Sequence, residues 1–217
     1  MSCFRYLISS LVLISILIFS CKQKSPDLIK YVDPLIGTAL ANTESVKLRP
    51  GDRVNNGQTI PAVTAPFGMT QWTPQTQPTE KKCFAPFYFG TTYIQGFRAT
   101  HWLSGSCTQD YGSFTVYPVS FDNQYRLMPN QRNTYYLMNN DTLSPAYLTT
   151  IFPETGILSE ITATKRSGFF RFSWIDAVDP TIIFDNNSDE GEGYIKIDTV
   201  KQEVIGYNPV RRIYAGS

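Results

Sequence analysis

Two short runs of alternating side chains, joined by a turn that ends in glycine, restrict the fold of this chain more than any other feature. The runs are residues 157–164 and 169–174, and the turn is residues 165–168. Successive side chains of a β-strand point to opposite faces. One face then gathers mainly apolar and aromatic residues, namely Ile157, Ser159, Ile161, Ala163, Phe170, Phe172 and Trp174. This pattern predicts a β-hairpin with one face toward a core.

The rest of the chain from Tyr31 onward contains no long run with helical periodicity. Short segments rich in β-branched and aromatic residues alternate with Gly, Pro, Asn and Asp, and they predict further strands at 114–119, 181–184, 194–197 and 204–207. Aromatic residues make up 14% of the sequence, enough bulk to fill the space between two sheets. We therefore predict an all-β fold, an antiparallel β-sandwich.

Two segments depart from this pattern. Residues 39–86 are rich in Pro, Gly, Thr and Gln and alternate little, which indicates a long functional loop or else strands that sequence patterns miss. Residues 210–217 begin like another strand and then stop, so we expect the sandwich to be incomplete at its C-terminal end.

The N-terminus is typical of an exported protein. Residues 1–20 carry one basic residue, Arg5, and then an apolar run too short to span a membrane. This signal peptide ends in Ile-Phe-Ser-Cys, which resembles a bacterial lipobox and predicts lipidation of Cys21, followed by a tether over residues 21–30. The expected location is the bacterial envelope, periplasmic or at the cell surface; an uncleaved signal anchor is the alternative.

Charge and cysteine content narrow the classes of partner. Removal of residues 1–20 takes away Arg5 alone, which leaves 18 basic and 18 acidic residues and excludes the positive potential that nucleic acids require. After export, Cys83 and Cys107 remain as candidates for a disulfide, with two buried free thiols as the alternative. No spacing of Cys and His residues indicates a metal site.

Residues 96–118 hold the best candidates for a binding site. The chain's one histidine, His101, adjoins Trp102, and a carboxylate, Asp110, follows closely. An aromatic plane with polar groups beside it is the usual construction of a sugar site. The alternative is structural: Trp102 would anchor the core and His101 would be a satisfied polar group.

Several motifs resemble the N-terminal domain of glycoside hydrolase family 92, the exported bacterial exo-α-mannosidases. They are YVDPLIGT (31–38), NNGQTIPAV (55–63), PFGMTQWTP (66–74), the stretch from Gly96, EITATKRSG (160–168) and GYNPVRRIY (206–214). The resemblance covers nearly all of residues 31–217. It implies a β-sandwich whose catalytic carboxylates lie in an absent (α/α) barrel domain, together with calcium, so that no catalytic or metal-ligating residue is assigned within this chain.

The resemblance also implies which residues lie near the sugar, since the family's active site forms between the two domains. These are His101, Trp102, Asp110, Gln71, Trp72 and Arg98. Arg98 and Ala99 depart from the histidine-rich GFSHTHLSG form that many relatives have, and Phe170 stands where relatives often have histidine. On its strand face, Phe170 is expected to pack.

Other assignments fit less well. The acidic residues 185–193 could suggest a calcium site of the EF-hand type. That pattern would need glycine where Glu190 stands and glutamate where Lys196 stands. A solvated connection between strands is therefore expected. A serine hydrolase lacks its GxSxG motif, and a sugar epimerase could draw only on His101.

The sequence therefore predicts one domain of an exported, calcium-dependent, inverting exo-α-mannosidase that trims glycans. This chain alone is expected to be inactive, because inversion needs two carboxylates roughly 6.5–9.5 Å apart. The alternative is a stand-alone carbohydrate-binding lipoprotein.

Overall fold

Antiparallel strands dominate the computed structural model, which describes residues 27–44, 48, 57–77, 84–104, 110, 113–120, 128, 131–132, 134–138, 142–175, 179–186 and 193–208. The chain divides into two compact units, residues 1–30 and 31–217. A 3₁₀ turn, η1 (Ile29–Tyr31), crosses that boundary. The strands all belong to the second unit.

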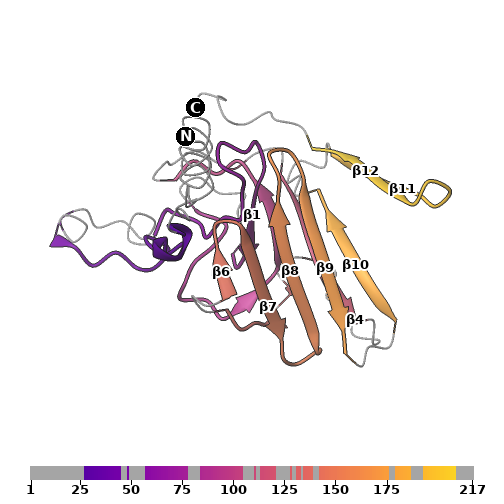
Figure 1. Ribbon diagram of the computed structural model, residues 1–217. Coiled ribbons are helices and arrows are strands. Elements are labelled where there is room, and N and C mark those ends of the chain that lie inside the picture. The colour runs from indigo at the N-terminus through magenta and orange to yellow at the C-terminus, as the bar shows by residue number, and fades with distance from the viewer. Residues whose placement is uncertain are drawn as a thin grey trace, which may run out of the picture. The chain divides into compact units, whose positions relative to one another are not determined.

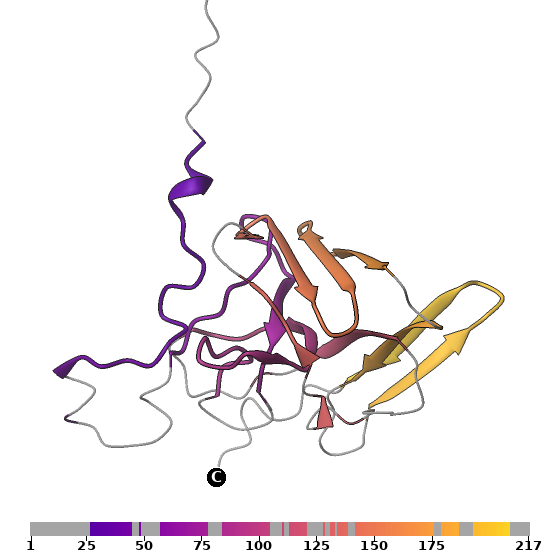
Figure 2. The ribbon, with the colours of Figure 1, turned by 90° about the horizontal axis from the view of Figure 1, so that it is seen from below.

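Two four-stranded sheets form the body of this unit (Figure 1). The first has the order β1 (Gln71–Gln75), β3 (Gly96–Thr100), β4 (Phe114–Ser120) and β10 (Pro180–Asp185). The second has the order β6 (Leu143–Ser144), β7 (Tyr147–Phe152), β8 (Ile157–Ala163) and β9 (Gly168–Trp174). Two-stranded pairs join β2 (Tyr93–Ile94) to β5 (Thr134–Tyr135) and β11 (Tyr194–Asp198) to β12 (Glu203–Tyr207). Seen from below, the orange strands β7 to β9 and the magenta strands of the first sheet lie in separate layers (Figure 2).

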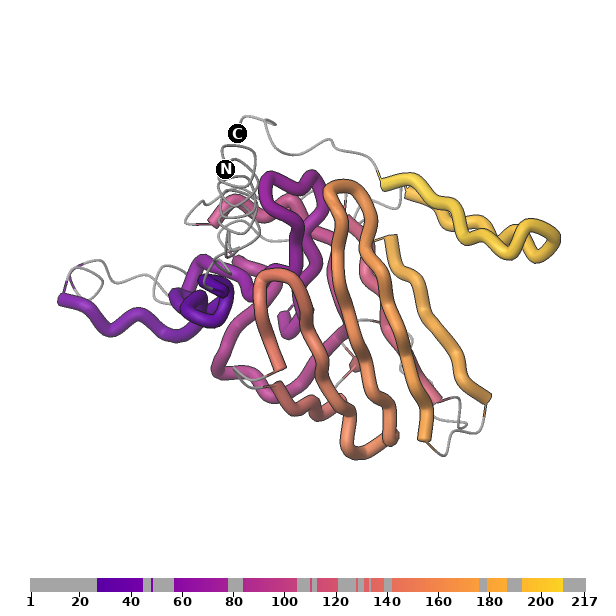
Figure 3. Tube along the Cα trace, in the orientation of Figure 1, coloured from indigo at the N-terminus to yellow at the C-terminus, as the bar shows by residue number. Residues whose placement is uncertain are grey.

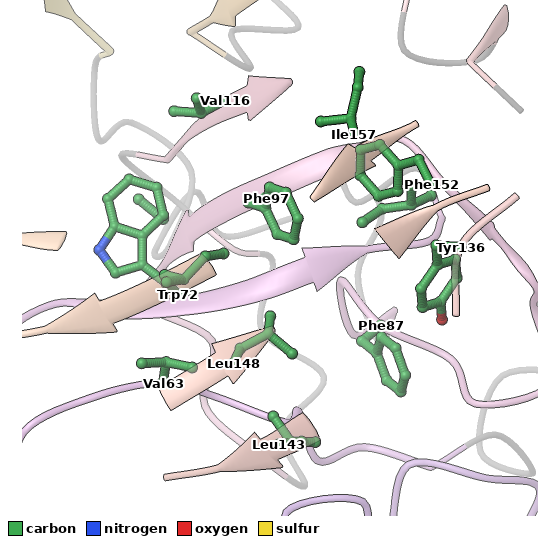
Figure 4. Close-up of a cluster of buried hydrophobic side chains, with 13 residues drawn as sticks. Val63, Trp72, Phe87, Phe97, Val116, Tyr136, Leu143, Leu148, Phe152 and Ile157 are labelled. Atoms are coloured by element: carbon green, nitrogen blue, oxygen red, sulfur yellow. The ribbon is translucent and has the colours of Figure 1, made fainter. Parts of the chain in front are cut away.

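The apolar core lies between the two four-stranded sheets. Phe97 of β3 stacks on Phe152 of β7, with ring centroids 6.1 Å apart (Figure 4). Phe97 also stacks on Phe172 of β9 at 6.3 Å. Buried side chains of β7 and β8 complete this cluster, and four of them are at most 1% exposed: Leu148, Phe152, Ile157 and Ile161. This arrangement confirms the predicted β-sandwich.

The predicted hairpin is confirmed as β8 and β9. Ile161 lies opposite Phe170, and Ile157 lies opposite Trp174, so both partners of each pair face the core. The four other predicted strands correspond to β4, β10, β11 and β12. The expected strand at the C-terminal end lies outside the described residues.

Within residues 39–86, the second of the two alternatives, strands that sequence patterns miss, holds for one segment. This segment, Gln71–Gln75, forms strand β1, although residues 39–86 alternate little and include Pro74. Proline is tolerated here because β1 is an edge strand of its sheet, and the isolated bridge on its other side joins Val63 to Trp72, not to Pro74. Sequence patterns also missed β3 and β7.

The sandwich is open along β9 and β10, the last strands of their sheets within the described part of the chain. A cavity of about 420 Å³ lies there between the sheets, and β10 contributes Ile182 and Phe184, which are 40% and 37% exposed. A second cavity of about 350 Å³ begins at Phe184 and continues along β12. Apolar side chains of the sandwich interior are thus accessible at this edge.

Candidate functional site

One rim of the sandwich holds three of the six predicted site residues. Gln71 begins β1 and lies opposite Thr100, which ends β3, so His101 and Trp102 emerge beside the start of β1. β8 ends at the same rim, where the N–H of Met69 donates to the carbonyl oxygen of Lys165 at 2.7 Å. Figure 3 shows the purple segment that precedes β1 beside the orange β8–β9 turn. The fold therefore brings Gln71, His101 and Trp102 together.

Strand β3 is buried on both faces, and the two faces differ in character. Phe97 and Ala99 face the apolar core, whereas Arg98 and Thr100 face the other side of the sheet. Arg98 lies between Thr73 of β1 and Thr115 of β4, which are both buried. The outer face of this sheet is therefore polar but withdrawn from water.

Asp110 supplies the negative charge that this buried face requires. Its Oδ2 atom accepts hydrogen bonds from Arg98 Nε at 2.8 Å and from Thr100 Oγ1 at 2.7 Å, while its Oδ1 atom accepts the backbone N–H of His101 at 3.0 Å. The side chains of Arg98 and Asp110 are 1% and 0% exposed. A buried charge needs such a partner, because removing one member of a buried pair costs about 3–5 kcal/mol.

Trp102 is held by hydrogen bonds at both its backbone and its indole ring. Its backbone N–H donates to Thr100 Oγ1 at 3.0 Å, and its Nε1–H donates to the carbonyl oxygen of Gln58 at 2.8 Å. Trp102 is 4% exposed, so the structural alternative describes its environment better than an open stacking platform does. It lies in an irregular segment, as expected.

His101 is the exposed member of this group. Its backbone is held by Asp110, whereas its side chain lies at the surface between the fixed residues Thr100 and Trp102. Gln71 is half-buried and pairs with Thr100, the residue that precedes His101. Both residues thus lie at the rim, His101 exposed and Gln71 half-buried.

The structure places Trp72, a predicted sugar contact, away from the rim. Trp72 was expected in an irregular segment, but it lies in β1 and packs in the core with edge-to-face contacts to Phe170 at 4.6 Å and Phe114 at 5.3 Å. A Cβ on Gly168 would come within 2.3 Å of Trp72 Nε1, so the glycine is needed for this packing. Trp72 is 5% exposed and serves the core.

Arg98 and Asp110, two further predicted sugar contacts, are buried as well. Their charged groups face each other inside the protein, not a ligand at the rim. Phe170, in contrast, packs as predicted, against Trp72 and Phe97.

Asp185, in the described part of the acidic segment 185–193, forms an ion pair with a second buried arginine. Arg132 pairs with Asp185 at 2.5 Å and lies over the ring of Tyr117, with its Cζ atom 5.0 Å from the centroid. Among the residues that the structure describes, no group of three His, Cys, Asp or Glu side chains could hold a metal ion. Residues 187–192 of this segment lie outside the described part of the chain.

Several sequence predictions fall outside the described part of the chain. These are lipidation at Cys21 and the pairing of Cys83 with Cys107. No helix within the described ranges is long and apolar enough to cross a membrane.

Sequence analysis missed two residues of the rim, Thr100 and Gln58. Thr100 could have been found, because residues 96–100 alternate between apolar and polar side chains on the pattern of a strand. The bond from Trp102 to Gln58 joins residues 44 positions apart and leaves no local signal.

Comparison with known proteins places this geometry in a family. Residues 31–217 match the model of the glycosyl hydrolase family 92 N-terminal domain. Among solved structures, the chain resembles the family GH92 inverting mannosidase BT2199 from Bacteroides thetaiotaomicron VPI-5482, with 25% identity, a TM-score of 0.67, and 85% of this chain and 23% of that chain covered.

A second solved relative extends the likeness. The family GH92 α-mannosidase BT3965 from Bacteroides thetaiotaomicron matches with 26% identity and a TM-score of 0.58, and the match covers 75% of this chain and 20% of that one. Its complex with mannoimidazole matches with 25% identity and a TM-score of 0.56, and covers 74% of this chain and 20% of that chain. No curated protein sequence matches. This chain thus spans about a fifth to a quarter of the length of these solved relatives.

Proposed function

This chain belongs to glycosyl hydrolase family 92 through that family's N-terminal domain, and from this membership we propose that it forms one wall of the mannose site of an α-mannosidase. The observation that carries the proposal is the match of its sandwich to mannosidase structures, one of them in complex with mannoimidazole. His101 and Gln71, at the rim, contact the sugar in this proposal. Trp102 shapes the wall from within.

The proton transfers belong to other parts of the enzyme. Inverting hydrolysis requires one carboxylic acid to protonate the leaving oxygen and one carboxylate to activate water. At the rim described above, the carboxylate of Asp110 is buried and paired with Arg98, so it can do neither. We propose that both groups, and the calcium ion of the complete enzyme, come from the α/α barrel domain that the family resemblance implies.

We also propose that the protein is located in the bacterial envelope. A lipidated Cys21 would anchor the protein in the bacterial envelope, where mannose-containing glycans from outside the cell are accessible. Metabolic labelling with a fatty acid should label the wild-type chain, and Cys21→Ser should abolish the label. Unchanged labelling in Cys21→Ser would contradict the anchor.

Binding is tested with mannoimidazole, with His101 itself as the reporter. The chain has one histidine, so its ring protons give NMR signals that need no assignment. We expect these signals to shift saturably with mannoimidazole, and Glu154→Gln, at the opposite β7–β8 turn, to preserve the response. His101→Ala should weaken binding as followed by calorimetry.

Two results would contradict the proposal. An absence of saturable binding would remove the sugar-site function, and hydrolysis of a mannoside by this chain alone would show that the catalytic groups lie within it. The alternative, a stand-alone carbohydrate-binding lipoprotein, would be favoured by binding to the chain together with a stop codon directly after the codon for Ser217.

A further inference from the structure

The geometry points to Arg98 and Asp110 as a positioning pair that sets the conformation of the His101–Trp102 segment and does not itself touch the sugar. The consequence for sugar binding depends on the proposed function. The conformational role does not, and the experiment below tests it separately.

The two carboxylate oxygens of Asp110 have different roles: one contacts side chains, and the other holds the backbone. Oδ2 faces Arg98 Nε and Thr100 Oγ1, while Oδ1 accepts the N–H of His101. Because the carboxylate is 0% exposed, water cannot replace it as the acceptor for that N–H. Its position therefore controls the backbone at His101.

Thr100 extends this control from His101 to Trp102. Its hydroxyl proton is directed to Asp110, which leaves an oxygen lone pair to accept the N–H of Trp102. The Trp102 ring in turn donates to Gln58, in a segment far away in the sequence. One carboxylate thus orients two consecutive backbone N–H groups and, through them, the exposed imidazole.

Stability alone does not account for a buried pair at this place. Well-packed apolar residues of similar volume often replace a buried ion pair without loss of stability. An apolar pair could fill the space of Arg98 and Asp110, but it could not accept the N–H of His101. The acceptor, more than the charge, is therefore the feature that the segment requires.

This distinction can be tested with two matched double variants of the full chain. Arg98→Met with Asp110→Asn removes both charges but keeps an amide oxygen, whereas Arg98→Met with Asp110→Leu removes the acceptor as well. Isotope-labelled histidine gives a single backbone amide signal, because the chain has one histidine. Hydrogen exchange of that amide reports its hydrogen bond directly.

We expect the amide to stay protected in the wild type and in the asparagine variant. In the leucine variant it should exchange about tenfold faster or more, an increase that exceeds the change at amides of the core strands β7 and β8, so that a lower global stability does not account for it. Equal protection in both variants would overturn the inference. So would equal loss of protection in both, since the retained oxygen would then have no effect.

Thr100→Val covers the case in which the leucine variant fails to fold. It removes the hydroxyl that links Asp110 to Trp102, and it should speed exchange at the Trp102 amide, assigned in the wild type; unchanged exchange there would overturn the relay. Mannoimidazole titrations of the folded variants separate the two proposals. If the exchange pattern holds but the wild type does not bind, only the proposed function fails.

Discussion

At the scale of single residues, burial separates the side chains of the rim that are enclosed by the protein from the one that lies at its surface. Trp102 and Asp110 are enclosed, and His101 is exposed, although all three lie within ten positions of one another. The exposed residue is held by the enclosed ones. Substitutions at these neighbouring positions should therefore have opposite effects on stability and on binding.

Trp102→Ala tests this division. Loss of a nearly buried indole and of its bond to Gln58 should destabilise the protein by about 3–5 kcal/mol, measured by urea unfolding. His101→Ala is the control and should stay within about 0.5 kcal/mol of the wild type, because the side chain is exposed. Near wild-type stability for Trp102→Ala would show instead that the indole is free to stack on a ligand.

At the scale of elements, the outer face of the second sheet has a polar ladder that should respond to acid. Glu160 of β8 lies opposite Arg171 of β9, which donates to it through both Nε and Nη2, and Tyr147 of β7 donates to it as well. These bonds, above all those from Arg171, lower the pKa of Glu160 from 4.5 to about 2. The folded state therefore favours the ionised carboxylate.

The sign of the pH dependence follows from this shift. The contribution of Glu160 is fully present above pH 4.5, its unfolded pKa, and is lost as the pH falls through about 2. Thermal midpoints of the wild type should exceed those of Glu160→Gln near neutral pH, and the gap should close over that interval. Arg171→Gln should show the same closing gap; a gap that is constant with pH would contradict this account.

The open edge along β9 and β10 exposes apolar side chains of the sandwich interior to solvent. An exposed strand edge beside apolar side chains favours association and binds hydrophobic dyes. Phe184→Thr should lower dye fluorescence, because Phe184 lines both cavities. The control is Phe169→Thr, which removes a 59% exposed phenylalanine that lines neither of these cavities. An equal decrease in both variants would indicate that the cavities do not bind the dye.

At the scale of the whole molecule, the regular secondary structure of the described residues consists of strands and one short 3₁₀ turn. Far-UV circular dichroism of the purified protein should be dominated by β signal. A strong helical spectrum would contradict the sandwich. Melting followed by tryptophan fluorescence should coincide with melting followed by circular dichroism, because Trp72 and Trp174 both belong to the core between the sheets.

Local patterns in the sequence predicted much of this fold. The period of two along β8 and β9 sets which side chains face inward, whatever the rest of the chain does. Strand β1 could not be found in this way, because Pro74 and two glutamines hide its strand character, and only pairing with β3 reveals it. The same applies to the burial of Trp72, which depends on Phe114 and Phe170.

The sequence by itself determined the class of fold, the family and the place of His101 beside Trp102. Only the tertiary structure decided that Asp110 faces Arg98 and the backbone of His101 instead of a ligand. The reason is physical: periodicity is a property of neighbours along the chain, whereas charge pairing and burial depend on residues that folding brings together. A carboxylate in a sequence shows that charge is present, and only the fold shows what that charge holds in place.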